Sequence, residues 1–185
     1  VESVEVSQGS LSLTVGGNLS ATLAKASANA TLKVGGTGVV EKLSAGANLS
    51  IEAGGLLEVS DISGQSAEVT SGGTIKLTGA LEDLTLLSSR DAEVTELDDL
   101  LVKRMEVFAG SLDMVIGGNL SLDSARIAKD ATLLVTDSAN VSDLEVSSGS
   151  LSLTVGGNLS ATLAKASANA TLKVGGTGVV EKLSS

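Results

Sequence analysis

The sequence predicts an all-β fold, a parallel β-helix (β-solenoid) with about 19–20 residues per coil. We expect it to be a right-handed parallel β-helix because crossover connections between parallel strands are right-handed. Three observations support this fold class. A long stretch of the chain is repeated in tandem, Gly-Gly pairs recur at nearly constant intervals, and apolar and polar residues alternate between those pairs.

The tandem repeat is the first observation. Residues 9–44 recur without change at 149–184. Self-similarity at a fixed period is typical of solenoids and repeat arrays. We therefore interpret residues 1–185 as one continuous solenoid, in which 9–148 form a complete 140-residue unit and 149–185 begin the next unit. Because Val1 falls in the middle of the pattern, we expect the chain to be a window of a longer protein.

The Gly-Gly pairs set a finer period within the unit. They lie at 16–17, 35–36, 54–55, 72–73, 117–118, 156–157 and 175–176, and the first steps are 19, 19 and 18 residues. The two long gaps each fit two coils if Leu97-Asp98 and Thr136-Asp137 replace missing pairs. This interpretation gives seven coils in one 140-residue unit. Glycine suits a corner because it adopts positive φ freely.

Between the corners, the alternation has the period of a β-strand. Ala30, Leu32 and Val34 form one face of a segment, and Thr31 and Lys33 form the other. Each coil is therefore expected to contain two or three short strands around a thin core, and coils are expected to stack at about 4.8 Å. An antiparallel sandwich also has many short strands, but it needs hairpin turns and gives no reason for a 19-residue interval.

The composition fits a narrow aliphatic core and limits the chemistry. Phe108 is the sole aromatic residue, and the chain has no Trp, Tyr, His, Cys or Pro. Without Cys and His, disulfides and the commonest metal ligands and general base are excluded, and we expect no cofactor and no metal site. The net charge of −10 disfavours nucleic acid and anionic membranes. No apolar run approaches the roughly 18 residues of a membrane span.

The phrase GSLSLTVGGNLSATLAKASANATLKVGG resembles the β-helix repeats of filamentous haemagglutinin-type adhesins, the large exoproteins of two-partner secretion. Those repeats have coils of the same length, with an L-x-V-x-GG-x-L core followed by an A-x-L-x-V strand. The likeness covers nearly the whole chain and is weakest at 80–110. It implies an extracellular, right-handed β-helical shaft that carries binding or effector regions elsewhere.

Every asparagine of the chain stands in an N-x-[ST] sequon. Alternation alone favours a polar-x-polar pattern on an outward strand face, so the sequons have a plain structural explanation. The other explanation is N-glycosylation of an exposed surface, and some adhesins of the resembled type carry sugars at such sequons. The candidate sites are Asn18, Asn29, Asn48, Asn119, Asn140, Asn158 and Asn169.

The segment 80–104 departs from the period, and we interpret it as a coil with an insertion. Solenoids place insertions in loops on one face, which is often the binding face. The candidate interaction loop comprises Glu82, Asp83, Arg90, Asp91, Glu93, Glu96, Asp98 and Asp99. Its carboxylates could bind Ca²⁺, but the segment has no known calcium motif and a solvated acidic loop explains it as well. Phe108, Met105 and Met114 are expected to fill a core that the insertion widens.

These observations favour a structural shaft or fibre repeat of a large secreted cell-surface protein, an adhesin-like stalk or extracellular filament with no chemistry of its own. A stalk gains reach from added copies, whereas an active site gains nothing from them. The expected partner is the chain itself, by end-to-end or lateral association of solenoids in a fibre. Other regions of the protein could bind a host or neighbouring-cell surface.

Two alternatives stay open. A self-assembling cytoskeletal polymer would share the composition, and an engineered scaffold would account for the duplication. An ice-binding solenoid needs a flat ladder of threonines on one face, and Thr14, Thr31, Thr70 and Thr85 do not line up in every coil. A β-helical carbohydrate-active enzyme would need a cleft with convergent acid, base and often arginine. The chain offers three arginines and no histidine, so this second alternative is the weaker one.

Overall fold

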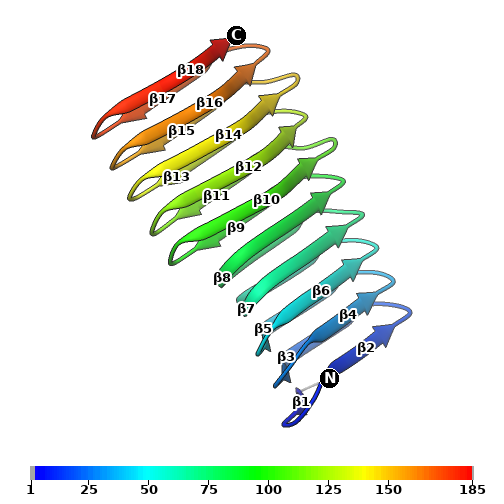
Figure 1. Ribbon diagram of the computed structural model, residues 1–185. Helices are drawn as coiled ribbons and strands as arrows, with labels where there is room; N and C mark the ends of the chain where they lie inside the picture. Colours follow the sequence, from blue (N-terminus) through cyan, green and yellow to red (C-terminus); the bar gives the residue numbers. More distant parts are fainter. Residues whose placement is uncertain (1–2, 185) are drawn as a thin grey trace.

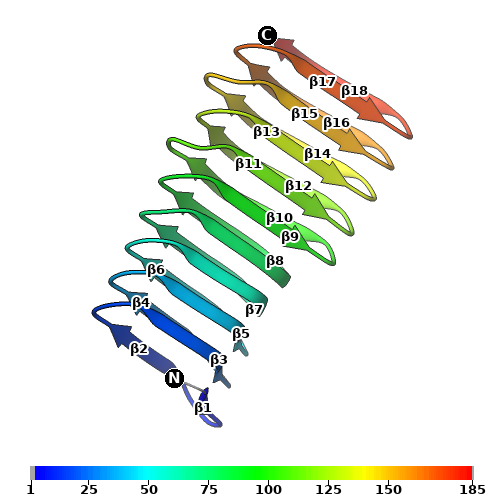
Figure 2. The same ribbon diagram turned by 180° about the vertical axis from the view of Figure 1, so that it is seen from behind.

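The computed structural model describes residues 3–184, so the outermost residues of the expected ranges, 1–2 and 185, lie outside it. This part of the chain contains β-strands and no helix, and consecutive coils of about 19 residues stack as about ten turns of a β-solenoid. Figures 1 and 2 show two sheets, back to back, running the length of the stack. All strand pairings are parallel. The fold class is confirmed as a β-solenoid, and the right-handed course stays a prediction.

The sheet that faces the viewer in Figure 1 is called the front sheet, and the other is called the back sheet. Two long strands, β7 (Leu57–Ser71) and β8 (Ile75–Ser88), begin in the back sheet and end in the front sheet. The other front strands are β2 (Leu11–Val15), β4 (Ala30–Val34), β6 (Asn48–Ala53), β10 (Leu100–Val107), β12 (Leu120–Ile127), β14 (Ala139–Val146), β16 (Leu159–Ala166) and β18 (Gly178–Ser184). The other back strands are β1 (Ser3–Val6), β3 (Leu19–Ala26), β5 (Gly38–Ala45), β9 (Ala92–Glu96), β11 (Leu112–Ile116), β13 (Ala131–Val135), β15 (Leu151–Val155) and β17 (Ala170–Val174).

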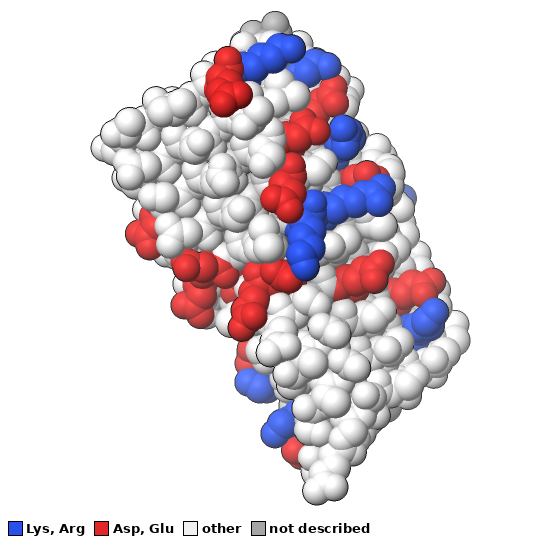
Figure 3. All heavy atoms as spheres, in the orientation of Figure 1, with Lys and Arg blue, Asp and Glu red and all other residues white. Residues whose placement is uncertain are grey.

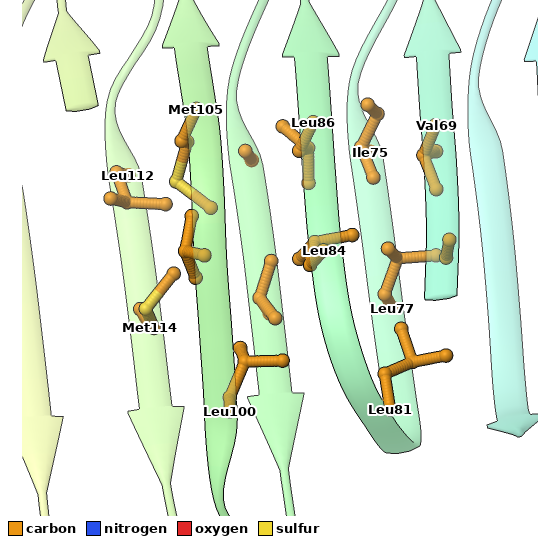
Figure 4. Packing of buried hydrophobic residues seen from close by; sticks show 14 of the residues in the cluster. Val69, Ile75, Leu77, Leu81, Leu84, Leu86, Leu100, Met105, Leu112 and Met114 are labelled. Carbon is orange, nitrogen blue, oxygen red and sulfur yellow. The ribbon is translucent and has the colours of Figure 1, made fainter. Parts of the chain in front are cut away.

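The core is a single layer of aliphatic side chains between the two sheets. Alternation turns every second residue inward, and the register places it on an inward residue of the coil below. One such column in the back sheet passes through Leu77, Val94 and Met114, which are at most 2% exposed. Figure 4 shows these columns meeting those of the front sheet, including Leu84, Leu86 and Met105. The expectation that both methionines lie in the core is confirmed.

The Gly-Gly pairs lie at corners, as predicted, and so do Leu97-Asp98 and Thr136-Asp137. The predicted reason was wrong, however. Gly9 is the one glycine with positive φ among residues 3–184. Close stacking explains the pairs instead: a Cβ on Gly54 would stand 2.2 Å from the carbonyl oxygen of Gly35 in the coil below. Glycine is favoured at position 54 because the backbones of successive corners touch there.

The corners form two edges. Edge 1 is where the chain passes from the front to the back sheet, at residues 16–18, 35–37, 54–56, 72–74, 89–91, 108–111, 128–130, 147–150 and 167–169. Edge 2 carries the return from back to front, at residues 7–10, 27–29, 46–47, 64–65, 80–82, 97–99, 117–119, 136–138, 156–158 and 175–177. Backbone hydrogen bonds link successive corners, such as Gly55 N–H to Gly36 O at 3.0 Å.

The prediction of seven coils in each repeat unit was wrong, because the strand pairings give seven and a half. The column that starts at Leu19 in the back sheet reaches Leu151 after seven pairings, through Gly38, Leu57, Ile75, Ala92, Leu112 and Ala131. Leu11, however, begins the front strand that precedes Leu19 by half a coil. Leu151 is the counterpart of Leu11 in the second unit, so the two identical phrases lie on opposite sheets.

The half-coil shift accompanies a move of the longer strand of each coil from the back sheet to the front sheet. In the first coils the back strands β3 and β5 have 8 residues and the front strands β2 and β4 have 5. From β10 onward the front strands before β18 have 8 residues and the back strands have 5. Between these regions β7 and β8 run without a break from the back sheet into the front sheet. The step from Ile75 to its partner Ala92 is the shortest in the back column. The stretch from Gly72 to Leu97 therefore makes one and a half coils, not one coil with an insertion.

The glycine contacts generate the first prediction. Gly54→Ala should lower the free energy of unfolding by about 2 kcal/mol or more, because its Cβ overlaps a backbone oxygen that cannot move alone. Gly16→Ala is the matched control, since a Cβ at the same corner position meets nothing within 4 Å. Urea unfolding followed by circular dichroism measures both. Equal costs for the two variants would show that corner stacking does not require glycine at position 54.

Candidate functional site

The acidic segment 82–104 does not form the expected loop. Glu82 and Asp83 lie in β8, Glu93 and Glu96 lie in β9, and the remaining four candidates occupy ordinary corners. Arg90 and Asp91 are at edge 1, whereas Asp98 and Asp99 are at edge 2. The eight candidates are therefore distributed over both sheets, both edges and the interior. They cannot act together as one interaction loop, because the extra residues are absorbed by half a coil.

Several of these side chains bind the neighbouring coil. Asp83 pairs with Lys103 at 2.6 Å and Glu93 with Lys76 at 3.1 Å. At the corners, Oδ1 of Asp91 accepts the N–H of Ser111 at 2.9 Å. Oδ1 of Asp99 accepts the N–H of Asn119 at 2.6 Å. Each partner lies on an adjacent coil, so these carboxylates hold coil to coil.

An acidic hollow of about 610 Å³ lies at edge 2. Its charged residues are Glu82, Asp98, Asp99 and Asp137, and glycines 64, 117 and 118 complete its wall. Within residues 3–184, no three acidic, His or Cys side chains are close enough together to hold a metal ion. The hollow is thus a concentration of negative charge, and its geometry does not support the Ca²⁺ interpretation.

Glu96 is the one buried charged residue among those described, at 2% exposed. It occupies the inward column that runs Ile62, Gly79, Glu96, Ile116, so an acid stands where neighbouring coils have aliphatic side chains. Gly79 lies directly against the backbone of Ile62, where a Cβ would stand 2.0 Å from the Ile62 carbonyl oxygen. The carboxylate accepts the N–H of Leu97 at 3.2 Å, and it is also hydrogen-bonded to the backbone of Leu81 and of Asp98. Glu96 therefore holds the backbone at the bend in β8 and at the following corner.

Burial raises the pKa of Glu96 to about 7. Removal from water penalises the charged form, and the hydrogen bonds from the backbone oppose that penalty only partly. The negative charge of Asp98 raises the pKa further. The sequence analysis placed Glu96 in an exposed loop and did not predict that it is buried. The alternation of Ala92, Val94 and Glu96 could have predicted that its side chain points inward.

The sequon asparagines are all exposed, as the alternation predicted. Four of them accept a backbone N–H from the next coil through Oδ1: Asn18 from Thr37 at 2.9 Å, Asn29 from Asn48 at 3.1 Å, Asn119 from Ser138 at 3.1 Å and Asn158 from Thr177 at 2.9 Å. Asn48 accepts the hydroxyl of Ser66 at 2.9 Å. These contacts give the asparagines a structural role at corners, and they leave the glycosylation hypothesis untested.

A groove of about 860 Å³ runs along edge 2 of the front sheet. One side is formed by corner residues, and the other by the first outward residue of each long front strand. Figure 3 shows this surface as a broad uncharged area on the left of the front sheet, with acidic residues below it and charged residues to its right. The groove is lined by Glu82, Asp99, Leu100, Leu101, Asn119, Leu120, Ser121, Ser138, Ala139, Asn140, Asn158, Leu159, Ser160, Thr177 and Val179.

Comparison with known proteins gives no assignment. No protein-family model matches the chain, and neither a curated protein nor a solved structure is significantly similar to it. Among residues 3–184, no helix is long and apolar enough to cross a membrane.

Glu96 makes folding stability depend on pH. Its folded pKa of about 7 exceeds the ordinary value of 4.5, so between these values the folded state holds a proton that the unfolded state has lost. The free energy of unfolding should therefore fall as the pH rises from 4.5 to 7 and then level off. Glu145, whose pKa is lowered by Lys165, acts in the opposite direction and below this window.

The measurement is urea unfolding of wild type and Glu96→Gln between pH 4.5 and 8. Glu96→Gln should lose most of the slope and be the more stable protein at pH 8. Glu41→Gln, an exposed carboxyl in β5, is the control and should keep the wild-type slope. If Glu96→Gln keeps that slope as well, the buried carboxyl is not the titrating group.

Proposed function

We propose that the chain is a structural shaft repeat of a large secreted cell-surface protein. The observation that carries this proposal is the unbroken parallel register across the repeat boundary. Ala131 in β13 pairs with Leu151 in β15, and Val141 in β14 pairs with Ala161 in β16. The second copy thus continues the solenoid of the first without a linker, so that added copies lengthen one rod.

The polar side chains support the same proposal. Many carboxylates and most sequon amides bind the next coil, as in Lys33–Glu52 at 3.1 Å, Lys165–Glu145 at 2.7 Å and the corner contact of Asn18 with Thr37 at 2.9 Å. Such exposed pairs each contribute little, on the order of 0–1 kcal/mol. Repeated on coil after coil, they favour in-register stacking. This distribution suits a rod better than a catalytic cleft, which gathers an acid, a base and binding groups at one place.

The extracellular location rests on other grounds. It comes from the resemblance to haemagglutinin-type repeats and from the exposure of all seven sequon asparagines. N-glycosylation on Nδ2 would be compatible with the Oδ1 contacts at the corners, because a different atom of the amide is modified. In this proposal, host or neighbouring-cell contacts are made by other regions, and the solenoid supplies length.

The shaft proposal predicts length by copy number. Proteins with one, two and four 140-residue units should appear in electron micrographs as single rods that lengthen by about 36 Å per unit, seven and a half coils at strand spacing. Antibodies against the folded chain should label intact cells of the source, and removal of glycans should lower the mass of the native protein. Rods that do not lengthen with copy number would contradict the shaft, and labelling only after permeabilisation would favour an intracellular scaffold.

A further inference from the structure

Phe108 is the starting observation. The chain's one aromatic residue is 61% exposed at the edge 1 corner that follows β10, which overturns the expectation that it fills the core. Val107 is the last inward residue of β10, and the N–H of Phe108 already belongs to the corner, bonded to Ser88 O at 2.9 Å. The ring therefore projects from a convex edge. Isolated exposed apolar residues are common. Phe108 therefore indicates a contact surface only if another part of the molecule could receive its ring.

The groove at edge 2 is such a part. Half-buried Leu101 and exposed Val179 present apolar surface to it, whereas Leu100, Leu120 and Leu159 are at most 2% exposed and belong to the core beneath its floor. Its volume of about 860 Å³ can take an aromatic ring. Leu100 and Leu101 are the first residues of β10, and Phe108 directly follows the last residue of the same strand. The ring and the lower end of the groove thus lie at the same height on opposite edges. A sideways shift of one molecule, with the axes kept parallel, brings Phe108 of one copy to the groove of the next.

Both basic and acidic residues lie around Phe108 at edge 1, whereas the charged residues around the groove at edge 2 are acidic. Exposed Arg90 and Lys129 flank Phe108 at edge 1. Edge 2 carries Glu82, Asp98, Asp99 and Asp137 beside and below the groove. Edge 1 also has two carboxylates, Asp91 and Asp130, whose Oδ1 atoms accept the N–H groups of Ser111 and Ser150, each at 2.9 Å. Pairing the basic groups of one copy with the acidic edge of another offsets the repulsion between chains of net charge −10.

The described back sheet carries a smaller apolar patch. Val115 and Leu134 are 37% and 44% exposed there and lie on adjacent strands. Another cavity on this sheet is lined by charged residues that include Lys76, Glu93 and Asp113. This patch supplies the control for the experiment below.

We propose that the chain associates side by side with further copies of itself, Phe108 at edge 1 of one copy inserting into the edge 2 groove of the next, with parallel axes. The inference rests on the proposed shaft function and names its partner. The contact joins two different surfaces, so each copy keeps one free edge of each kind. Such a heterologous contact does not close, and it gives a raft or bundle of parallel rods.

Sedimentation equilibrium and electron microscopy test the contact. Wild type should associate in a concentration-dependent way into rods lying side by side. Phe108→Ser should raise the dissociation constant by about tenfold or more, the effect of losing a buried aromatic anchor. Lys129→Glu should weaken association less, and added salt should reduce the difference between Lys129→Glu and wild type. Leu134→Ser, on the back sheet, should associate like wild type. Because Phe108 and Leu134 are exposed, neither serine variant should alter the circular dichroism spectrum.

Cross-linking identifies the two surfaces, since the chain has no cysteine of its own. Ala109→Cys beside the ring, mixed with Ser121→Cys in the groove, should form disulfide-linked pairs under oxidation. The control mixture of Ala109→Cys with Thr132→Cys, on the back sheet, should form few. Wild type that stays monomeric at millimolar concentration would overturn the contact, and so would Phe108→Ser associating like wild type. The shaft would survive either result, because rod length per copy is measured independently.

Discussion

The parallel, in-register stacking of coils is the constraint on which the whole structure depends. Each strand forms its hydrogen bonds with the coils above and below. Whether a residue fits therefore depends on the residue at the same position one coil away. Inward positions need aliphatic side chains of matched size, such as Leu133 on Met114. Outward positions need opposite charges or neutral groups, and one front column reads Glu106, Arg126, Glu145, Lys165. Stacking also explains the glycine corners, where backbone lies directly on backbone.

The middle of the chain shows how such a stack accommodates a long strand that changes sheets. The long strand moves from the back sheet to the front sheet between β5 and β10. The inward positions of this region hold Ser71, Ser88 and Glu96 in columns that are otherwise aliphatic. The two serines bind corner carbonyls, Ser88 at 3.0 Å from Gly73 O. Polar interior groups thus satisfy backbone atoms where the corners become irregular, and Glu96 does so with a carboxyl whose pKa lies near 7.

Much of the fold could be predicted from the sequence because period and alternation are local signals. The alternation placed Ala30, Leu32 and Val34 inside, and the doublets Leu97-Asp98 and Thr136-Asp137 were correctly identified as corners. Which of the two sheets each later strand joins could not be predicted in this way. The stretch that follows Gly72 fits either an insertion or an extra half coil, and the choice depends on which strands pair, a non-local property. The candidate loop failed for the same reason, and Phe108 was misplaced because a widened core was assumed.

The half-coil phase also bears on how a shaft of such units would present its surface. Copies of the phrase 9–44 face opposite directions in successive units, so a groove at edge 2 in one unit would recur at edge 1 in the next. A rod of this kind offers the same lateral contact on both sides, which suits bundling. The half coil in each unit therefore determines which edges of a rod are available for lateral contact.

Electron cryo-microscopy of a four-unit tandem array tests this account most directly, because it locates every copy of the repeated phrase. We predict that the strand equivalent to Leu151–Val155 alternates between the two sheets, with a true axial period of fifteen coils, about 72 Å at strand spacing. An axial period of seven coils, about 34 Å, with every copy on the same sheet, would contradict the pairing described for β7, β8 and β9.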